Sequence, residues 1–217
     1  MFSDRLNRRL LRHHLPLALI TLASGYVLYV TRPYPDVISR LSFASAYPAL
    51  VLLCLTLVIG PWKVLAGDKL TVSFDLRRDI GIWAGLTGLF HTGFGQFAHL
   101  RGRPWLYYIY ENWQEEHGQP FRLDRFGFSN DTGLIASLIL LALLATSNDA
   151  ALRKLGTPGW KKLQRWNYAC FAFTALHTFG YLAGGFSQRL GWVILAASAI
   201  AITVTLQFIG WRKRKAI

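Results

Sequence analysis

The 217-residue chain has few cysteines and few charged residues, and both shortages narrow the classes of protein to which it can belong. Cys54 and Cys170 are its only cysteines, which excludes a disulfide framework, a four-thiolate metal site and an iron–sulfur cluster. The sequence has no Cys-x-x-Cys-His motif, so covalent c-type haem is excluded as well. Charged residues make up 16% of the chain, against about 25% in an average soluble domain. This composition excludes a typical soluble enzyme.

A nucleotide-binding fingerprint is also missing. No Gly-x-Gly-x-x-Gly segment occurs in the sequence, and the apolar segments leave no room for a flavin or nicotinamide domain. The chain is therefore not expected to collect hydride by itself.

Apolar residues, in contrast, are abundant: they make up 53% of the chain, and the mean hydropathy is +0.28. A transmembrane helix needs about 20 mostly apolar residues. The apolar segments predict an all-α, polytopic membrane protein, a bundle of six transmembrane helices at about residues 15–31, 43–62, 80–100, 132–148, 166–186 and 191–211. Residues 1–217 then form a single transmembrane domain, with one long outer loop at 101–131.

The basic residues predict the orientation of this bundle. The net charge is +13, and 17 of the 24 Lys and Arg residues fall in the N-terminal segment, in every second loop and in the C-terminal tail. Loops that remain in the cytoplasm carry an excess of Lys and Arg. We therefore expect both termini on the cytoplasmic side. The positive charge reports on topology, and no nucleic-acid partner is expected.

Two histidines are predicted at the same depth in the membrane. His91 lies 12 residues after Asp79, and His177 lies 12 residues after Arg165. At 1.5 Å per residue, both lie about 18 Å from the inner end of their helices. The third and fifth spans run in the same direction, so the two imidazoles can face each other across a gap.

Small residues share the helix faces of these histidines. Gly88 and Gly95 flank His91, and Gly180 follows His177 on the outward side. A flat macrocycle between helices needs such an absence of side chains, and one haem b with two axial histidines fits the pattern. A proton relay, a structural histidine and a metal site are the alternatives. A zinc site has little support, because two histidines are too few ligands.

The remaining histidines carry weaker signals. His13 and His14 are expected to be solvated near the membrane surface, and His117 is expected on the surface of the outer loop. His99 lies eight residues beyond His91, and the fifth span offers no histidine at a matching depth. A second haem is therefore not expected.

Haem propionates need cations or hydrogen-bond donors, and Arg101 and Arg103 lie just outside the third span. They are candidates for this role, Arg189 is another, and ordinary interfacial arginines are the alternative. The aromatic outer loop that follows is a candidate docking surface for an electron acceptor, and an interfacial helix is the alternative there.

Two segments resemble a known family. The loop between the fourth and fifth spans reads Thr-Ser-Asn-Asp-Ala-Ala-Leu-Arg-Lys-Leu-Gly from Thr146 and Trp-Lys-Lys-Leu-Gln-Arg-Trp-Asn-Tyr from Trp160, and leads to His177. The second segment reads Arg-Arg-Asp-Ile-Gly from Arg77 and leads to His91. Together the two segments resemble the ferric-reductase-like transmembrane domain, in particular the YedZ/MsrQ type of haem-binding subunit.

This resemblance implies a six-helix bundle with b haem between the third and fifth spans, and His91 and His177 match the ligand positions. One departure is Gln164, where the family usually has a further histidine. The resemblance therefore implies one haem rather than two.

The resemblance also implies one-electron transfer across the bacterial inner membrane, in the MsrQ branch to a periplasmic molybdenum enzyme that repairs methionine sulfoxide. The donor is expected to be a quinol or a cytoplasmic flavoenzyme, with a quinone or a bound FMN near Arg77, Arg78, Gln164 and Arg165 as intermediate. Arginines that mark topology and anchor at lipid headgroups are the alternative for these basic residues. The chain is then an oxidoreductase electron-transfer subunit without a nucleotide-binding domain of its own. A direct ferric-chelate reductase and a haem-free structural or assembly subunit are the alternatives.

Overall fold

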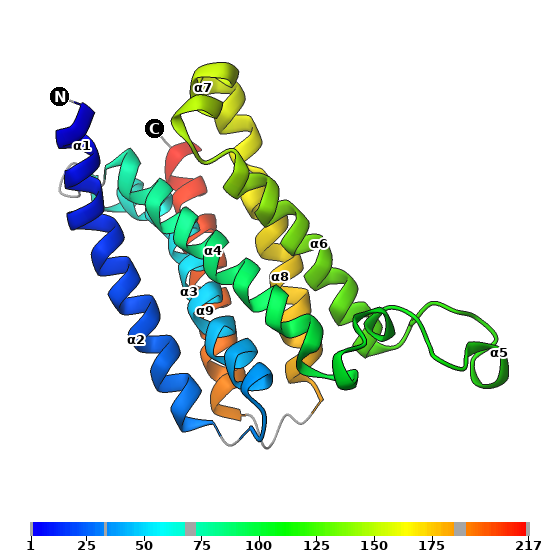
Figure 1. The fold of residues 1–217 in the computed structure, drawn as a ribbon. Helices are drawn as coiled ribbons and strands as arrows, with labels where there is room; N and C mark the ends of the chain where they lie inside the picture. Colours follow the sequence, from blue (N-terminus) through cyan, green and yellow to red (C-terminus); the bar gives the residue numbers. More distant parts are fainter. Residues whose placement is uncertain (1, 33, 68–72, 185–189, 216–217) are drawn as a thin grey trace.

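The computed structural model describes residues 2–32, 34–67, 73–184 and 190–215; for residues 2–5, 74 and 101 it describes the backbone alone. Long helices lie side by side and dominate the described chain (Figure 1). The N-terminal helix runs without a break through α1 (Phe2–Arg9), a π-helical turn η1 (Leu10–His14) and α2 (Leu15–Thr31). The other long helices are α3 (Val37–Ala66), α4 (Phe74–Ala98), α6 (Arg125–Ala145), α8 (Trp166–Leu182) and α9 (Leu190–Lys215).

Four helices in the described chain are long and apolar enough to cross a membrane. They cover Leu6–Thr31, Val37–Ala66, Arg125–Ala145 and Leu190–Lys215. This confirms the prediction of a helical membrane protein. The other two predicted spans correspond to α4, whose hydropathy is lowered by glycines, His91 and Gln96, and to α8, which has only 17 residues. Six spans and cytoplasmic termini therefore stay a prediction.

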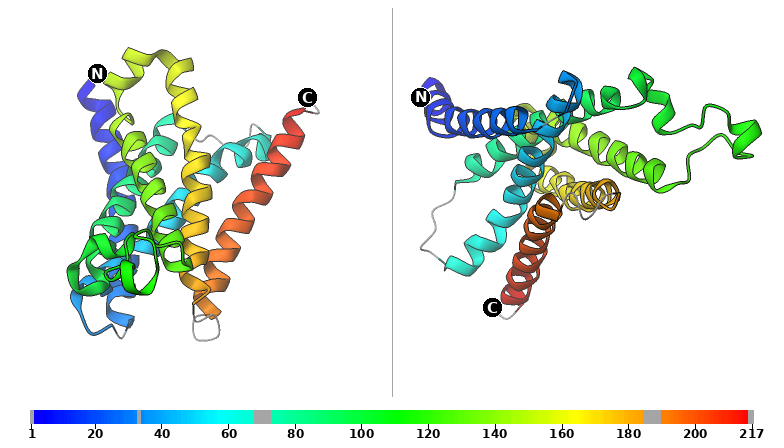
Figure 2. Two further views of the ribbon diagram at one scale, coloured as in Figure 1. Left: turned by 90° about the vertical axis from the view of Figure 1, so that its right-hand side faces the viewer. Right: turned by 90° about the horizontal axis from the view of Figure 1, so that it is seen from below.

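Among the described residues, α3 contributes the most buried side chains of these helices. α4 packs along α3 and against α6, α6 packs along α8, and α9 packs against α3. Figure 2 shows α2 and α9 further from the centre than α4 and α8. The buried core joins Leu53 and Leu57 of α3 to Ile80 and Ala84 of α4, and extends to Cys170 of α8. The core therefore centres on α3.

Capping side chains fix where several helices begin. The carboxylate of Asp36 accepts a hydrogen bond from the backbone N–H of Ser39, at the start of α3. Asp124 does the same for Gly127, at the start of α6. As a result α6 begins at Arg125, within the segment assigned above to the outer loop.

The outer segment projects beside the bundle (Figure 1). It contains short helical turns at η3 (Leu100–Gly102), η4 (Pro104–Tyr107) and α5 (Trp113–Glu116). Tyr107 ties it to the bundle: its side chain is 1% exposed, and its hydroxyl donates to the carbonyl of Gly95 at 2.8 Å. At the opposite end, α7 (Asp149–Gln164) joins α6 to α8.

Candidate cofactor site

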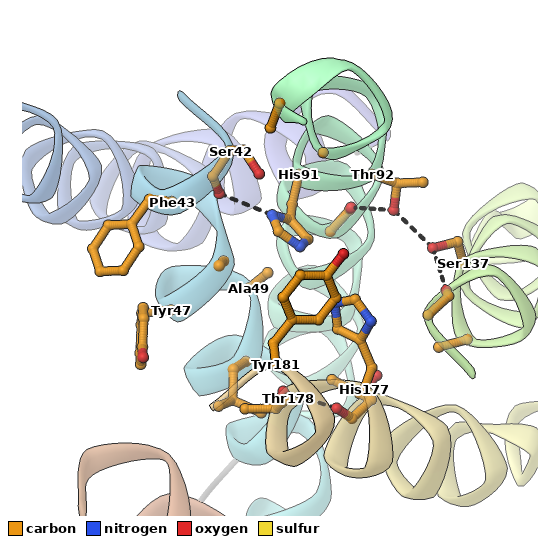
Figure 3. Close-up of a pocket in the computed structure, with 18 of the residues that line it drawn as sticks. Ser42, Phe43, Tyr47, Ala49, His91, Thr92, Ser137, His177, Thr178 and Tyr181 are labelled. Carbon is orange, nitrogen blue, oxygen red and sulfur yellow. Dashed lines mark hydrogen bonds between the residues drawn. The ribbon is translucent and has the colours of Figure 1, made fainter. Parts of the chain in front are cut away.

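A cavity of about 430 Å³ lies between α3, α4, α6 and α8. His91 of α4 and His177 of α8 both line it, and Figure 3 shows the two rings near each other at its centre. Their ring centroids are 6.1 Å apart, and the ring planes are inclined by 71°. The structure thus brings together the two histidines that the sequence places at matched depth.

Backbone carbonyls fix both imidazoles. Nδ1 of His91 lies 2.8 Å from the carbonyl oxygen of Ser42, and Nδ1 of His177 lies 2.7 Å from that of Ser129. A carbonyl oxygen only accepts hydrogen bonds, so each Nδ1 carries the proton and donates it. Each Nε2 is left with a free lone pair. This is the arrangement by which proteins orient histidine ligands of metals.

The spacing of the rings fits one metal ion between them. A bond from an imidazole nitrogen to a metal is about 2 Å long, which places two rings on one metal roughly 6 Å apart between centroids. In the described part of the chain, no three His, Cys, Asp or Glu side chains gather as a metal-binding group. Two imidazoles without a third protein ligand fit a metal that brings its other ligands with it, as haem iron does.

The predicted glycines do different work in the structure. Gly88 and Gly95 line the cavity, whereas Gly180 packs on Ser129 outside the lining. A Cβ at Gly88 would lie 2.5 Å from Cδ2 of Leu140, so this glycine brings α4 close to α6. At least two of the three glycines therefore serve close packing of the helices that carry the histidines.

Gly133 is a site residue that the sequence analysis missed. It lies on α6 against the imidazole of His177, and a Cβ there would lie 2.8 Å from Cε1 of the ring. A small residue in an otherwise leucine-rich span was the only signal in the sequence. The spacing around the histidines does not identify it, because the contact joins two different helices.

Polar side chains complete the walls of the cavity. The hydroxyl of Thr92 lies 2.7 Å from that of Ser137, and Tyr181 donates to Oδ1 of Asn130 at 2.6 Å. The ring of Tyr181 lies 5.0 Å from that of His177 between centroids (Figure 3). Thr92, Ser137 and Tyr181 carry hydroxyl groups on otherwise apolar helices. Such residues are a sequence signal for a polar cavity wall, and the sequence analysis did not use it.

Of the arginines proposed for the propionates, only Arg103 has a described side chain, and Arg189 lies outside the described residues. Arg103 forms an ion pair with Glu111 and does not belong to the cavity lining, while the side chain of Arg101 lies outside the described residues. Arg32, at the end of α2, does line the cavity. Its position could not be read from the sequence, because only the packing of α2 and α9 against α3 brings it there.

The other histidines fall into three environments. His99 lines the cavity at the end of α4, with its ring 6.4 Å from that of Tyr181. His117 stacks on Tyr110 at 3.6 Å in the outer segment. The expectation that His13 and His14 are solvated is wrong, because both contact the fully buried carboxylate of Asp79, at 2.8 Å and 3.3 Å.

The arginines near the start of α4 hold helices together. Arg78 pairs with Asp149 of α7 at 2.5 Å, and Nε of Arg77 donates to the carbonyl of Thr56 in α3 at 3.1 Å. Nε2 of Gln164 is buried and has no hydrogen-bond partner among the described residues. These contacts give no support to a flavin or quinone at this position.

Comparison with known proteins places these features in context. No family model matches the chain. The chain is 29% identical over 154 residues to the protein-methionine-sulfoxide reductase heme-binding subunit MsrQ of Deinococcus radiodurans, a match that covers 70% of the chain and 68% of that protein. This similarity confirms the resemblance to the YedZ/MsrQ type.

A second relative is much longer than the chain. The magnetosome protein MamZ of Magnetospirillum gryphiswaldense is 27% identical over 164 residues, which cover 76% of the chain and 22% of MamZ. The chain thus spans about a fifth of the length of MamZ.

Proposed function

We propose that the chain is a b-type cytochrome subunit of a bacterial inner membrane that binds one haem between His91 and His177 and passes electrons across the membrane. The observation that carries the proposal is the pair of carbonyl-anchored imidazoles, 6.1 Å apart, at one cavity. The similarity to a haem-binding subunit supports it. Haem, when bound, supplies a reversible one-electron carrier.

The chain's own residues hold and tune this group. His91 and His177 would hold the haem iron, and the carbonyls of Ser42 and Ser129 keep each Nε2 free and its ring oriented. Apolar side chains exclude water around the ligands, and the residues that provide this lining are Leu50, Leu53, Ala84, Ala136, Leu140 and Leu182. A dry, low-dielectric site is one means by which a protein sets the potential of a haem.

An aromatic chain leads from the ligand to the outer segment. The ring of Tyr181 lies 5.0 Å from that of His177, His99 lies 6.4 Å from Tyr181, and Tyr107 lies 6.3 Å from His99. Tyr107 belongs to the outer segment. We propose that electrons leave on this side, to a periplasmic redox partner that docks on residues 101–124.

The name of the relative MsrQ indicates the class of electron acceptor to expect. MsrQ is named as the heme-binding subunit of a protein-methionine-sulfoxide reductase. We propose an acceptor of this class, and a quinol or a cytoplasmic flavoenzyme as the electron donor. We also propose that the chain crosses the membrane six times, with both termini in the cytoplasm.

The test is the reduced-minus-oxidised absorbance spectrum of the detergent-purified protein, with haem quantified per chain. We expect close to one haem b per chain, with sharp low-spin bands. Two haems per chain would show that His99 or Gln164 supports a second site. Protein from haem-replete cells without a Soret band would overturn the proposal. Reoxidation of the reduced protein by ferric chelate alone would favour a direct ferric reductase instead.

A further inference from the structure

The cavity at His91 and His177 has one cationic residue. Among the described residues that line it, Arg32 alone carries a permanent charge, and none is an acid. No described carboxylate forms an ion pair with Arg32. A guanidinium that faces a cavity without an acidic partner is suited to bind a carboxylate of a ligand, because its N–H groups match that group's geometry.

Aromatic rings hold the guanidinium in place. The Cζ atom of Arg32 lies 4.8 Å from the ring centroid of Phe43 and 4.1 Å from that of Trp192. The two rings contact each other edge to face at 5.0 Å, and Tyr47 packs on both. The attraction of a cation to an aromatic ring uses no acceptor atom, and a guanidinium has five N–H donors. The cage therefore orients Arg32 and leaves donors available.

The cavity is polar at the end of Arg32 and apolar at the other. Ser39 near the start of α3, and Gln96 and His99 at the end of α4, lie toward the end of Arg32. Leu50 and Leu53 of α3 and Ala84 of α4 lie further along these helices, toward the opposite end. Along α4, the lining extends from Ala84 to Ala98, which is about 21 Å at 1.5 Å per residue. His91 lies halfway. The cavity thus matches a ligand with an apolar body and an anionic edge.

We infer that Arg32 binds a propionate carboxylate of the haem, so that the propionate edge faces the end of the cavity formed by α2, α3 and α9. The inference rests on the proposed function, since it requires haem between His91 and His177. It assigns to Arg32 the role for which the sequence offered Arg101 and Arg103.

The test compares two forms of haem in binding to the apo-protein: protohaem, and protohaem dimethyl ester, whose propionates carry no charge. A hydrogen bond to a charged group changes affinity roughly 10- to 100-fold. We expect the ratio of the two dissociation constants to favour protohaem more strongly in the wild type than in Arg32→Gln, by about this factor. Arg32→Lys keeps the charge and should retain part of the preference.

Two further variants serve as matched controls. Arg40 lies near the same end and donates to the carbonyl of Tyr34 at 2.6 Å, but does not line the cavity. Arg40→Gln and Arg103→Gln should both keep the wild-type ratio.

The outcomes separate this inference from the proposed function. An unchanged ratio in Arg32→Gln, or loss of the preference in Arg103→Gln instead, overturns the role of Arg32 and leaves the haem site standing. A wild type that binds neither form overturns the proposed function. If Arg32→Gln does not fold, Arg32→Lys takes its place in the test. A ratio of dissociation constants in Arg32→Lys that is unchanged from the wild type would then overturn the inference.

Discussion

Two pairs of histidines lie on or beside α4, and they differ in what holds them. Nδ1 of His91 and of His177 donates to a backbone carbonyl, whereas His13 and His14 both contact the carboxylate of Asp79. A carbonyl orients an imidazole without adding charge, so Nε2 keeps its lone pair for a metal. A carboxylate binds the ring into an ionic cluster instead.

His13 and His14, the pair at Asp79, have a structural role. The indole N–H of Trp83 donates to Nδ1 of His14 at 3.2 Å, so the proton of a neutral His14 is on Nε2, which faces Asp79. Arg9 also forms an ion pair with Asp79. The cluster fastens the N-terminal helix to α4. The same residue type therefore serves anchoring at one end of α4 and, by our proposal, ligation in its middle.

Removal of either proposed ligand should have the largest effect. We expect His91→Ala and His177→Ala each to abolish low-spin haem, because one imidazole cannot supply both axial bonds. His13→Ala and His14→Ala should keep haem near the wild-type amount, as should His99→Ala and His117→Ala. Haem per chain and the absorbance spectrum measure this. Wild-type spectra in the first two variants would contradict the ligand assignment.

Removal of the buried carboxylate should be the next largest effect, and on stability rather than on haem. Asp79→Asn leaves Arg9 without its anion, and breaking a buried ion pair in this way costs about 3–5 kcal/mol. Chemical denaturation in detergent measures the free energy of unfolding. The exposed acid Asp131 provides a control: Asp131→Asn should change stability by less than about 0.5 kcal/mol. Equal effects of the two variants would refute the anchoring role of Asp79.

Gly133→Ala tests how tightly the carbonyl-bound ring is held. The added Cβ meets the ring of His177, which must shift against its hydrogen bond to Ser129, and overpacking of this kind costs about 1–3 kcal/mol. We expect weaker haem binding and altered low-spin bands. Gly93→Ala is the matched control, because nothing lies within 4 Å of its added Cβ. A Gly133→Ala spectrum identical to that of Gly93→Ala would show that His177 is not confined by α6.

The smallest expected effect on stability comes from Asp124, the residue that caps the start of α6. This start of the helix positions the carbonyl of Ser129. Desolvation raises the pKa of Asp124, but the N–H of Gly127 and the guanidinium of Arg122 outweigh it, so the pKa lies below its usual value. The cap therefore contributes its full stability above about pH 4 and loses it as the pH falls through the lowered pKa. We expect Asp124→Ala to cost about 1 kcal/mol at pH 7, measured by denaturation. At a pH below the lowered pKa the difference from wild type should shrink, and a constant difference would exclude the charged cap.

Parts of the site followed from local pattern, and parts did not. The helices and the nearness of His91 to His177 were predicted because apolar runs and residue counts along a helix are local properties. The hydrogen bond from His91 to Ser42 joins residues 49 apart, and that from His177 to Ser129 joins residues 48 apart. No spacing rule selects such partners, and the same holds for Asp79 with Arg9, which are 70 residues apart.

By itself, the sequence determined a helical membrane protein with two histidines at one depth on neighbouring helices, since hydropathy and helical rise require only the order of residues. Only the tertiary structure decided which carbonyls fix the rings, which glycines serve packing and which arginine faces the cavity. The physical reason is that these features depend on which helix faces meet, and helices of nearly uniform apolar character leave that choice to side-chain packing across the whole bundle.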